Sequence, residues 1–410
     1  MAHIKAFSAY RPEKSIADKV AALPYDVYNR QEAKAVVADN PLSFLRIDRA
    51  ETAFDDSVST YDPCVYQKAK ELLNGMIENG QYIPDSKDMY YIYELIMDGR
   101  HQTGIVACAS IDDYQSGVIK KHENTREDKE VDRITHVETC NAQTGPIFLA
   151  YRAKQEIDSI VDRVKQGIPE YAFTSDDGIT HNVWLVSDDS DISGIREAFA
   201  NISDIYIADG HHRAASAVKV GLRKRNGNPN TVGDEEYNFF LSVLFPHNQL
   251  KILPYNRVIK DLNGYSESEF LDRISESFEV EELSDAYAPD KKCTFGMYLS
   301  KKWYKLTARE HIRSDNPVEG LDVSILQNSL LEPVLGIKDP RTDKRIDFVG
   351  GIRGLAELER RANDDMKLAF SMYPTSIEEL FDVADAGLLM PPKSTWFEPK
   401  LRSGIFIHKL

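Results

Sequence analysis

The chain has 410 residues, of which 42% are apolar and 28% are charged, and its formal net charge is −16. This length predicts two or three globular domains with ample material for a hydrophobic core. An acidic surface repels nucleic acid and anionic membranes unless a local basic patch overrides it. We therefore expect neither nucleic acid nor a membrane as a partner.

The four cysteines are far apart and form no C-x-x-C pair, which argues against a zinc ribbon or a disulfide scaffold. The first residues carry no signal peptide, and no apolar run is long enough to span a bilayer. These features predict a cytoplasmic protein with reduced thiols. The oligomeric state stays open.

The first predicted elements surround a proline-containing turn. Residues 3–11 form a short strand, and Pro24 favours an extended or turn conformation in 23–29. Asn29 caps a helix over 30–38, and 42–47 is predicted to be a strand. Two interpretations remain open here: an ordinary α/β edge, or a small-molecule site with Tyr25, Asp26 and Arg46 around it.

Regular patterns continue through the middle of the chain. We expect an amphipathic helix over 62–79, then a hairpin of 89–97 and 102–110 joined by an Asp-Gly turn. A helix begins near 125 or 127 and runs through 141. The remaining predicted elements are a strand (145–151), a helix (153–166), a hairpin (173–177 with 181–186) and a short helix (193–200).

Polar residues gather just before the helix that begins near 125. His122, Glu123 and Thr125 follow an apolar strand, where a site is expected. A carboxylate beside an imidazole can deprotonate a hydroxyl, and a Glu near phosphates can equally hold a metal. Lys129 and Arg133 lie on one helical face. The alternative for 127–133 is a solvated charged helix.

The densest cluster of candidate functional residues follows a run over 205–208 that favours a β-strand. Gly210 suits a tight turn, and a helix is predicted from 214 to about 225. Asp209, His211, His212 and Arg213 therefore meet at a strand end and a helix start, where unpaired N–H groups favour anions. Asp209 suits a Mg²⁺ ion or a proton-accepting role. The alternative is that Asp209 caps the helix and the basic groups are solvated.

Near residue 266 the pattern changes to a helix followed by short strand-like segments. This change predicts two domains, 1–264 and 265–410, with a tail (390–404) that returns to the site. Strands are expected over 237–245, 252–258, 278–283, 293–299, 303–308, 345–349, 368–372 and 405–408, and helices over 267–278, 322–335 and after the capping box at 376–379. In the tail, Lys393, Ser394, Thr395 and Lys400 suit an anion. The alternative is a proline-rich surface loop docked by Trp396 and Phe397.

No P-loop and no protein-kinase signature set occurs in the chain. Phosphoryl transfer needs cations that spread the phosphate charge, a base for the acceptor hydroxyl, and in-line geometry. The histidines, arginines, lysines and carboxylates singled out above supply these groups. The residues therefore predict a phosphate-handling enzyme without naming its substrate.

Asp209-Gly210-His211-His212-Arg213 resembles the DGHHR motif of free serine kinases in the ParB/sulfiredoxin-like superfamily. The whole chain is similar to a bacterial family catalogued only as a domain of unknown function, with members linked to pyrophosphate-dependent phosphorylation of free L-serine. The matching stretches, in order, are 24–27, 40–47, 122–133, 209–213 and 391–404. Archaeal relatives use ADP as the donor. The ParB-like core is much shorter than this chain.

The resemblance implies a mixed α/β fold with a ParB/sulfiredoxin-like core and an additional α/β subdomain. It also implies phosphoryl transfer from pyrophosphate, or a nucleoside diphosphate, to free L-serine. Asp209, His211, His212 and Arg213 would bind the donor and take part in catalysis, and the other motifs would complete the pocket.

Our hypothesis for the individual roles goes further. Arg213, His211 and the helix start hold the donor phosphates, and Lys393 and Lys400 reach in from the tail. Glu123 or Asp209 is the base, and Mg²⁺ bridges the phosphates. Either Arg46 or Arg133 pairs with the substrate carboxylate. Three alternatives stay open: a phosphatase or pyrophosphate hydrolase that uses the same pocket, a ParB-like nucleotide- or DNA-binding regulator, and a serine sensor without turnover.

Overall fold

A computed structural model describes residues 1–410 and divides the chain into two compact units. Unit 1 comprises Met1–Leu250 together with Pro399–Leu410, and unit 2 comprises Lys251–Glu398. The sequence-based boundary lay at 264/265, whereas this division falls at 250/251 and returns the last segment of the chain to unit 1. Strands and helices occur in both units, which confirms the mixed α/β class.

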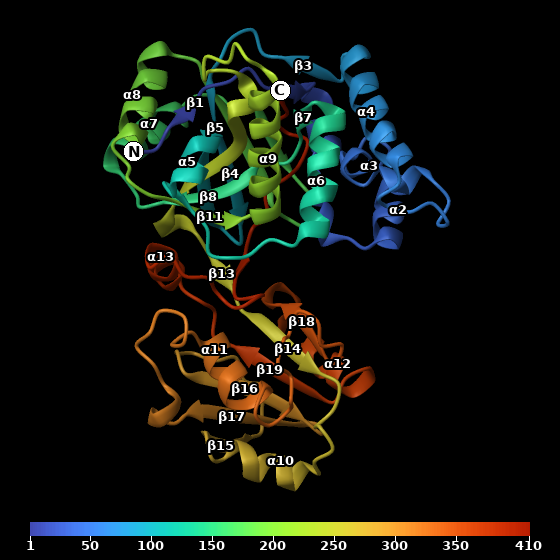
Figure 1. The fold of residues 1–410 in the computed structure, drawn as a ribbon, viewed down its shortest axis with the longest axis vertical. Helices are drawn as coiled ribbons and strands as arrows, with labels where there is room; N and C mark the ends of the chain where they lie inside the picture. Colours follow the sequence, from blue (N-terminus) through green and yellow to red (C-terminus); the bar gives the residue numbers. More distant parts are fainter. The chain divides into compact units, whose positions relative to one another are not determined.

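Unit 1 is built on a mixed sheet of nine strands (Figure 1). The order is β6-β11-β8-β12-β5-β4-β10-β9, and β1 pairs with β5 beside this path. Neighbouring strands are mostly antiparallel, but β11 runs parallel to β6 and β12 runs parallel to β8. The strands are β1 (Ile4–Lys5), β4 (Tyr90–Met97), β5 (Arg100–Ser110), β6 (Ile119–Lys120), β8 (Ile147–Tyr151), β9 (Tyr171–Thr174), β10 (Thr180–Val186), β11 (Ile205–Asp209) and β12 (Phe239–Pro246).

Two predicted hairpins are confirmed because local turn chemistry decides them. Asp98 and Gly99 both have positive φ, 52° and 75°, as a two-residue turn between antiparallel strands requires. The turn joins β4 to β5, with Met97 opposite Arg100. In the second hairpin, β9 pairs with β10. β12 is buried along its whole length, as its mostly apolar sequence predicts, and its one hydroxyl residue, Ser242, is buried with it.

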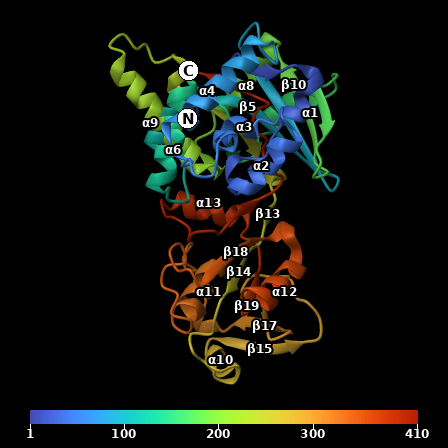
Figure 2. The same cartoon turned by 90° about the vertical axis from the view of Figure 1, so that its right-hand side faces the viewer.

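Helices and short two-stranded ladders complete unit 1 (Figures 1 and 2). α9 packs along α6, and the Ser216 hydroxyl donates a hydrogen bond to the Glu130 carbonyl across 3.2 Å. The helices are α1 (Ala17–Val20), α2 (Arg30–Asp39), α3 (Leu45–Asp48), α4 (Pro63–Glu78), α5 (Ile111–Ser116), α6 (Glu127–Cys140), α7 (Gln155–Val164), α8 (Asp189–Ala200) and α9 (His211–Gly227). The short strands are β2 (Tyr10–Pro12), β3 (Tyr82–Pro84), β7 (Ala142–Gln143) and β21 (His408–Lys409).

The predicted strand over 42–47 is wrong. Asn40 and Ser43 accept hydrogen bonds from the N–H groups of Leu42 and Leu45, at 3.1 and 3.3 Å. These turns lead into the helix α3, Leu45–Asp48. Leu45 and Ile47 are fully buried in an apolar cluster with residues of α4. Local capping and this tertiary burial outweigh the apparent alternation of the sequence.

The C-terminal segment runs through the interior of unit 1. Ile405, Phe406 and Ile407 are fully buried, and Ile407 forms a bridge with Tyr10. The hydroxyl of Tyr82 donates a hydrogen bond to the Gly404 carbonyl at 2.6 Å. The end of the chain is therefore part of the core of unit 1.

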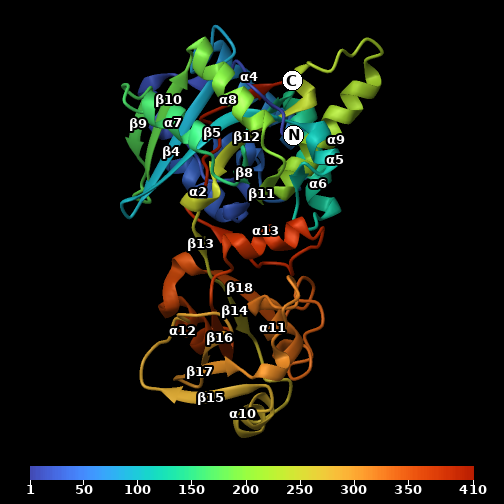
Figure 3. The same cartoon turned by 90° about the vertical axis from the view of Figure 1, so that its left-hand side faces the viewer.

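Unit 2 has a separate six-stranded antiparallel sheet in the order β15-β17-β16-β19-β14-β18 (Figure 3). Its strands are β14 (Tyr255–Ile259), β15 (Phe278–Leu283), β16 (Thr294–Leu299), β17 (Lys302–Ala308), β18 (Ile346–Gly350) and β19 (Leu368–Met372). Its helices are α10 (Glu267–Ile274), α11 (Asp322–Leu326), α12 (Gly354–Asp364) and α13 (Ile377–Asp385). The predicted capping box of α13 is present.

Unit 2 has adjacent ends and one irregular helix. The two ends of the unit lie side by side, because β13 (Ile252–Leu253) pairs with β20 (Trp396–Phe397). The helix predicted over 322–335 is interrupted: α11 passes into a π-helical turn, Gln327–Leu331. None of the helices in either unit has the length and apolar character needed to span a membrane.

Candidate active site

The candidate site begins where β11 ends and α9 starts. Gly210 has φ 93°, a left-handed conformation that a residue without a side chain adopts most easily. A register shift between Ile207 and Asp209 marks a bulge in the pairing of β11 with β8. The predicted strand, turn and helix are thus confirmed, and four polar residues, Asp209, His211, His212 and Arg213, lie at the end of the strand and in the first turn of the helix.

Asp209 is held by a residue from the far end of the sequence. Its Oδ2 lies 2.9 Å from Lys400 Nζ, and its Oδ1 accepts a hydrogen bond from the Gly210 N–H at 2.8 Å. Burial would raise the pKa of the Asp209 carboxyl, but Lys400 and Arg213 outweigh burial and hold that pKa well below its usual value. Asp209 is therefore a carboxylate with little tendency to accept a proton.

Arg213 folds back over the turn from which it starts. Its Nη1 donates a hydrogen bond to the Pro146 carbonyl at 2.6 Å. A side chain at position 210 would meet the Arg213 guanidinium, with its Cβ 3.0 Å from Nη2. The absence of a side chain at Gly210 thus gives the guanidinium its place beside the helix start.

Two histidines form a buried pair next to this turn. The rings of His122 and His211 meet edge to face with centroids 4.4 Å apart. Neither ring nitrogen of His122 has a hydrogen-bond partner. Burial lowers the pKa of His122 to about 4 and the pKa of His211 well below its ordinary value. Both imidazoles are thus neutral at pH 7, and Glu123 Oε2 lies 4.0 Å from His211 Nδ1.

His212 and Thr125 take part in contacts between α9 and the segment before α6. The Arg126 N–H donates a hydrogen bond to His212 Nε2 at 3.0 Å. The Thr125 hydroxyl binds Glu130, and that carboxylate also pairs with Lys219. These contacts tie the segment before α6 to α9, so His122, Glu123 and Thr125 are positioned against the turn.

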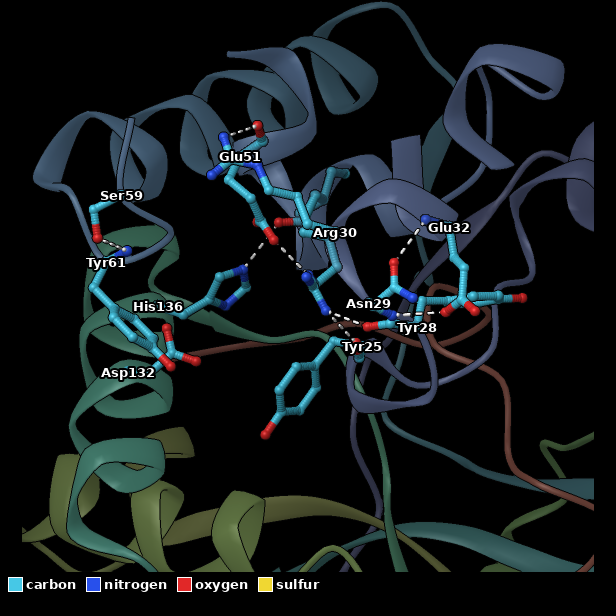
Figure 4. Close-up of polar contacts among 12 residues, drawn as sticks. Tyr25, Tyr28, Asn29, Arg30, Glu32, Glu51, Ser59, Tyr61, Asp132 and His136 are labelled. Carbon is cyan, nitrogen blue, oxygen red and sulfur yellow. Dashed lines mark hydrogen bonds and ion pairs between the residues drawn. The ribbon is translucent and has the colours of Figure 1, made fainter. Parts of the chain in front are cut away.

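A cavity of about 280 Å³ opens in unit 1 between the segments 25–28 and 47–51 and the helices α4 and α6. Figure 4 shows the Tyr25, Glu51, Asp132 and His136 side chains around this space. Its lining carries both signs of charge, from Asp26, Asp48, Arg49, Glu51, Lys129, Asp132 and Arg133. Such a lining suits a small ligand that itself has both a cation and an anion.

Arg133 is the buried cation of the cavity. Its Nη2 lies 2.9 Å from Asp132 Oδ2, and its guanidinium stacks on Tyr25 with Cζ 4.0 Å from the ring centroid. The Tyr66 hydroxyl donates a hydrogen bond to the other oxygen of Asp132 at 2.9 Å. Burial would lower the pKa of Arg133, but Asp132, Tyr25 and Asp48 together outweigh burial and raise that pKa. Burial raises the pKa of Tyr25 to about 12, so its hydroxyl stays protonated.

The sequence reasoning missed several residues that line the same cavity. Arg49 donates hydrogen bonds to the carbonyls of Tyr25 and Tyr28, at 3.0 and 2.6 Å, and pairs with the buried Glu51. Asp48 accepts a hydrogen bond from the Thr144 hydroxyl at 2.9 Å. The signal was the charged run at 46–51, which the incorrect strand assignment obscured.

A smaller cavity, of about 40 Å³, shares lining residues with the larger cavity and is also lined by Arg213 from the start of α9. Arg133 and Tyr25, which also line the larger cavity, lie on its wall together with Arg213 and Ser403. One continuous set of residues therefore runs from the mixed-charge cavity to the start of α9. This arrangement suits one ligand beside Arg133 and a second, anionic ligand beside Arg213.

The structure brings most of the predicted site residues of unit 1 together and leaves one out. Arg46 does not line either cavity, and its guanidinium donates a hydrogen bond to the Pro41 carbonyl at 2.7 Å. Lys393, Ser394 and Thr395 belong to unit 2. The Ser394 hydroxyl there donates a hydrogen bond to the Pro391 carbonyl at 2.6 Å.

The side chains near the turn allow a direct test of whether they fit a metal ion. No group of three or more histidine, cysteine or carboxylate side chains is arranged as a metal cage. Asp209 offers one carboxylate, and Mg²⁺ in phosphate sites commonly takes one or two carboxylates, with phosphate oxygens and water as the other ligands. Asp209 therefore fits a Mg²⁺ ion that arrives with a phosphate donor.

The chain belongs to the family described as "Protein of unknown function (DUF1015)", whose profile matches residues 4–324. That match confirms the family suggested by the sequence motifs. A search among curated proteins found no match.

Several solved structures resemble the fold at low similarity. A free serine kinase in complex with AMP is 16% identical, with a TM-score of 0.36 over 72% of this chain and 86% of that one. A conserved hypothetical protein from Pyrococcus furiosus is 15% identical, with a TM-score of 0.35 over 74% and 94%. SbnI with C-terminal truncation from Staphylococcus aureus is 10% identical, with a TM-score of 0.39 over 72% and 85%.

Proposed function

We propose that unit 1 is a phosphotransferase that phosphorylates free L-serine to O-phospho-L-serine, with pyrophosphate as the donor. The observation that carries this proposal is the continuity of one lining from Arg133 to Arg213. This lining supports the proposal because it joins a mixed-charge cavity, which suits a small acceptor, to a cationic helix start, which suits a phosphate donor.

The acceptor side is matched to a zwitterion. Arg133 is buried and donates in a plane, which suits the carboxylate of an amino acid. Asp26, Asp48 and Glu51 also line the cavity and suit an ammonium group. A volume of about 280 Å³ lies at the small end of ligand pockets and favours an acceptor the size of serine.

The donor side combines three sources of positive potential. The first turn of α9 presents unpaired N–H groups, and Arg213 and Lys400 lie beside it. In the reaction, the serine hydroxyl oxygen forms a bond to one phosphorus atom of pyrophosphate, and the bridging P–O bond breaks. Orthophosphate leaves with the electron pair of that bond. When bound, Mg²⁺ neutralises charge on the phosphate oxygens, and Asp209 is the residue that would hold it.

Glu123 is the better candidate for the base that takes the serine proton. Asp209 is paired with Lys400, which keeps its carboxylate weakly basic. The Glu123 side chain is 40% exposed and reaches to 4.0 Å from His211. A carboxylate of this kind can take up a proton and then release it to solvent.

The test is direct. The purified protein is incubated with L-serine, Mg²⁺ and, separately, pyrophosphate, ADP or ATP, and O-phosphoserine is measured by mass. We expect product with pyrophosphate, and a loss of turnover of about 10²-fold or more in Glu123→Gln with pyrophosphate binding retained. Unchanged turnover would remove Glu123 as the base. Phosphate release from pyrophosphate in the absence of serine would indicate a hydrolase instead.

A further inference from the structure

Unit 2 contains a buried arginine that lacks a counter-charge. Four arginines are buried in the molecule, and three of them pair with a carboxylate: Arg11 with Asp85, Arg133 with Asp132, and Arg402 with Asp177. The fourth, Arg257 on β14, is 4% exposed and forms no ion pair. Burying a cation without a partner is costly.

The contacts of Arg257 are all to neutral groups. Its Nη1 donates a hydrogen bond to the Tyr255 carbonyl, and its Nη2 donates one to the Lys393 carbonyl at 3.0 Å. Its Cζ lies 5.4 Å from the centroid of the Phe348 ring. Burial lowers the pKa of this guanidinium to about 10. Two carbonyls satisfy only part of a guanidinium that has five N–H donors.

The residue whose carbonyl binds Arg257, Lys393, is itself cationic and has an unusual backbone conformation. Lys393 follows Pro392 and has φ 60°, the left-handed conformation that a type II turn requires and that glycine adopts without strain. Its Nζ lies 5.4 Å from the centroid of the Tyr255 ring. Tyr255 thus contacts both cations, through its carbonyl and through its ring.

The turn around Lys393 is fixed on both sides. The Thr375 hydroxyl donates a hydrogen bond to the Ser394 carbonyl at 3.0 Å. Trp396 follows on β20, which pairs with β13, and a side chain at Gly350 would meet its ring at 2.8 Å. Strained residues in a well-anchored loop are typical of ligand clamps.

We propose that Arg257 and Lys393 form an oxyanion site within unit 2, for a phosphate group or its chemical equivalent. The planar guanidinium supplies directional N–H donors, and the lysine supplies a point charge. The bound oxyanion provides the counter-charge that Arg257 otherwise lacks. This inference concerns unit 2 alone and does not depend on serine phosphorylation by unit 1.

The experiment compares two lysines in the same backbone conformation. Lys301, in the turn between β16 and β17, is exposed and has φ 66°. Lys393→Gly and Lys301→Gly therefore each remove one ammonium and relax one left-handed residue. Calorimetry with pyrophosphate, and separately with orthophosphate, is performed on the full chain without serine. We expect Lys393→Gly to weaken binding about ten-fold or more, or to remove one equivalent of bound anion, and Lys301→Gly to bind as wild type does.

Equal binding by the two variants, or no anion binding by the wild-type protein, would overturn the proposal. Arg257→Lys is the second test, because it keeps the charge but loses the planar donor set; we expect it to weaken binding. Its folding is checked by circular dichroism, and Lys393→Gly decides the matter if Arg257→Lys does not fold. A protein that makes no phosphoserine but loses anion affinity in Lys393→Gly would disprove the proposed activity and keep this site.

Discussion

Arg133 and Arg46 look equivalent in the sequence as partners for a substrate carboxylate, and the structure separates them. Arg133 is buried, stacked on Tyr25 and part of both cavity linings. Arg46 bonds to a carbonyl of its own loop. We expect Arg133→Gln to lower kcat/KM for serine by about 10- to 100-fold, the value of a charge-assisted hydrogen bond. Arg46→Gln is the matched control, and equal losses in the two variants would contradict the assignment.

His122 allows a prediction about pH. The pKa of its buried imidazole is about 4, against an ordinary value near 6.5. The unfolded chain therefore binds the proton first as the pH falls. The stability associated with a neutral His122 is complete above about pH 6.5 and is lost between there and pH 4, by about 3 kcal/mol at most.

We expect His122→Phe to be at least as stable as wild type at pH 7, because it removes two buried ring nitrogens that lack partners. Its free energy of unfolding should also fall less between about pH 7 and pH 4.5. Urea unfolding at both pH values measures this, with the exposed His311→Phe as control. A variant with the same pH dependence as wild type would refute the buried-neutral state.

At the scale of the element, the turn between β11 and α9 depends on Gly210. Gly210→Ala introduces a Cβ 3.0 Å from the Arg213 guanidinium at φ 93°. We expect a loss of about 1–2 kcal/mol in stability, together with weaker pyrophosphate binding as Arg213 is displaced. Gly227→Ala, in the last position of the same helix, has open space around it and should cost nothing. Thermal unfolding and calorimetry of both variants provide the measurement.

Elements that depend on neighbouring residues could be predicted from the sequence, and contacts between distant residues could not. The hairpin β4–β5 and the strand-turn-helix at 205–213 depend on neighbouring residues, so local patterns identify them. α3 was missed because its hydrogen-bonding turns compete with an alternating pattern. The motifs predicted that Lys400 reaches the donor phosphates but not that it pairs with Asp209, since no periodicity links residues so far apart. Arg257 was passed over because a charge inside an apolar strand gives no sign of whether it has a partner.

At the scale of the whole molecule, unit 2 is inserted in unit 1 between Leu250 and Pro399. Its two ends are paired through β13 and β20, and the Glu398 N–H donates a hydrogen bond to the Lys251 carbonyl at 3.2 Å. An insertion with adjacent ends can be removed without separating the flanking chain. We expect a protein in which a short Gly/Ser linker replaces 252–397 to retain a cooperatively folded unit 1.

The matching control removes the last segment instead. A chain that ends at 398 lacks the buried Ile405, Phe406 and Ile407, and we expect it to lose cooperative unfolding in urea. Circular dichroism and limited proteolysis compare the two proteins. A folded truncation, or an unfolded linker protein, would contradict the division into units.

The path of the C-terminal segment also sets an order of events during synthesis. Domains generally fold from the N-terminus as the chain leaves the ribosome, at about 5–20 residues per second. Unit 1 cannot finish folding before unit 2 is made, because Lys400 and the buried residues after it follow unit 2 in the sequence. All of unit 2 emerges before the partner of Asp209 does. A chain that stops before residue 400 therefore carries the turn at 209–213 without its lysine, and only a chain that extends beyond Lys400 can assemble the site.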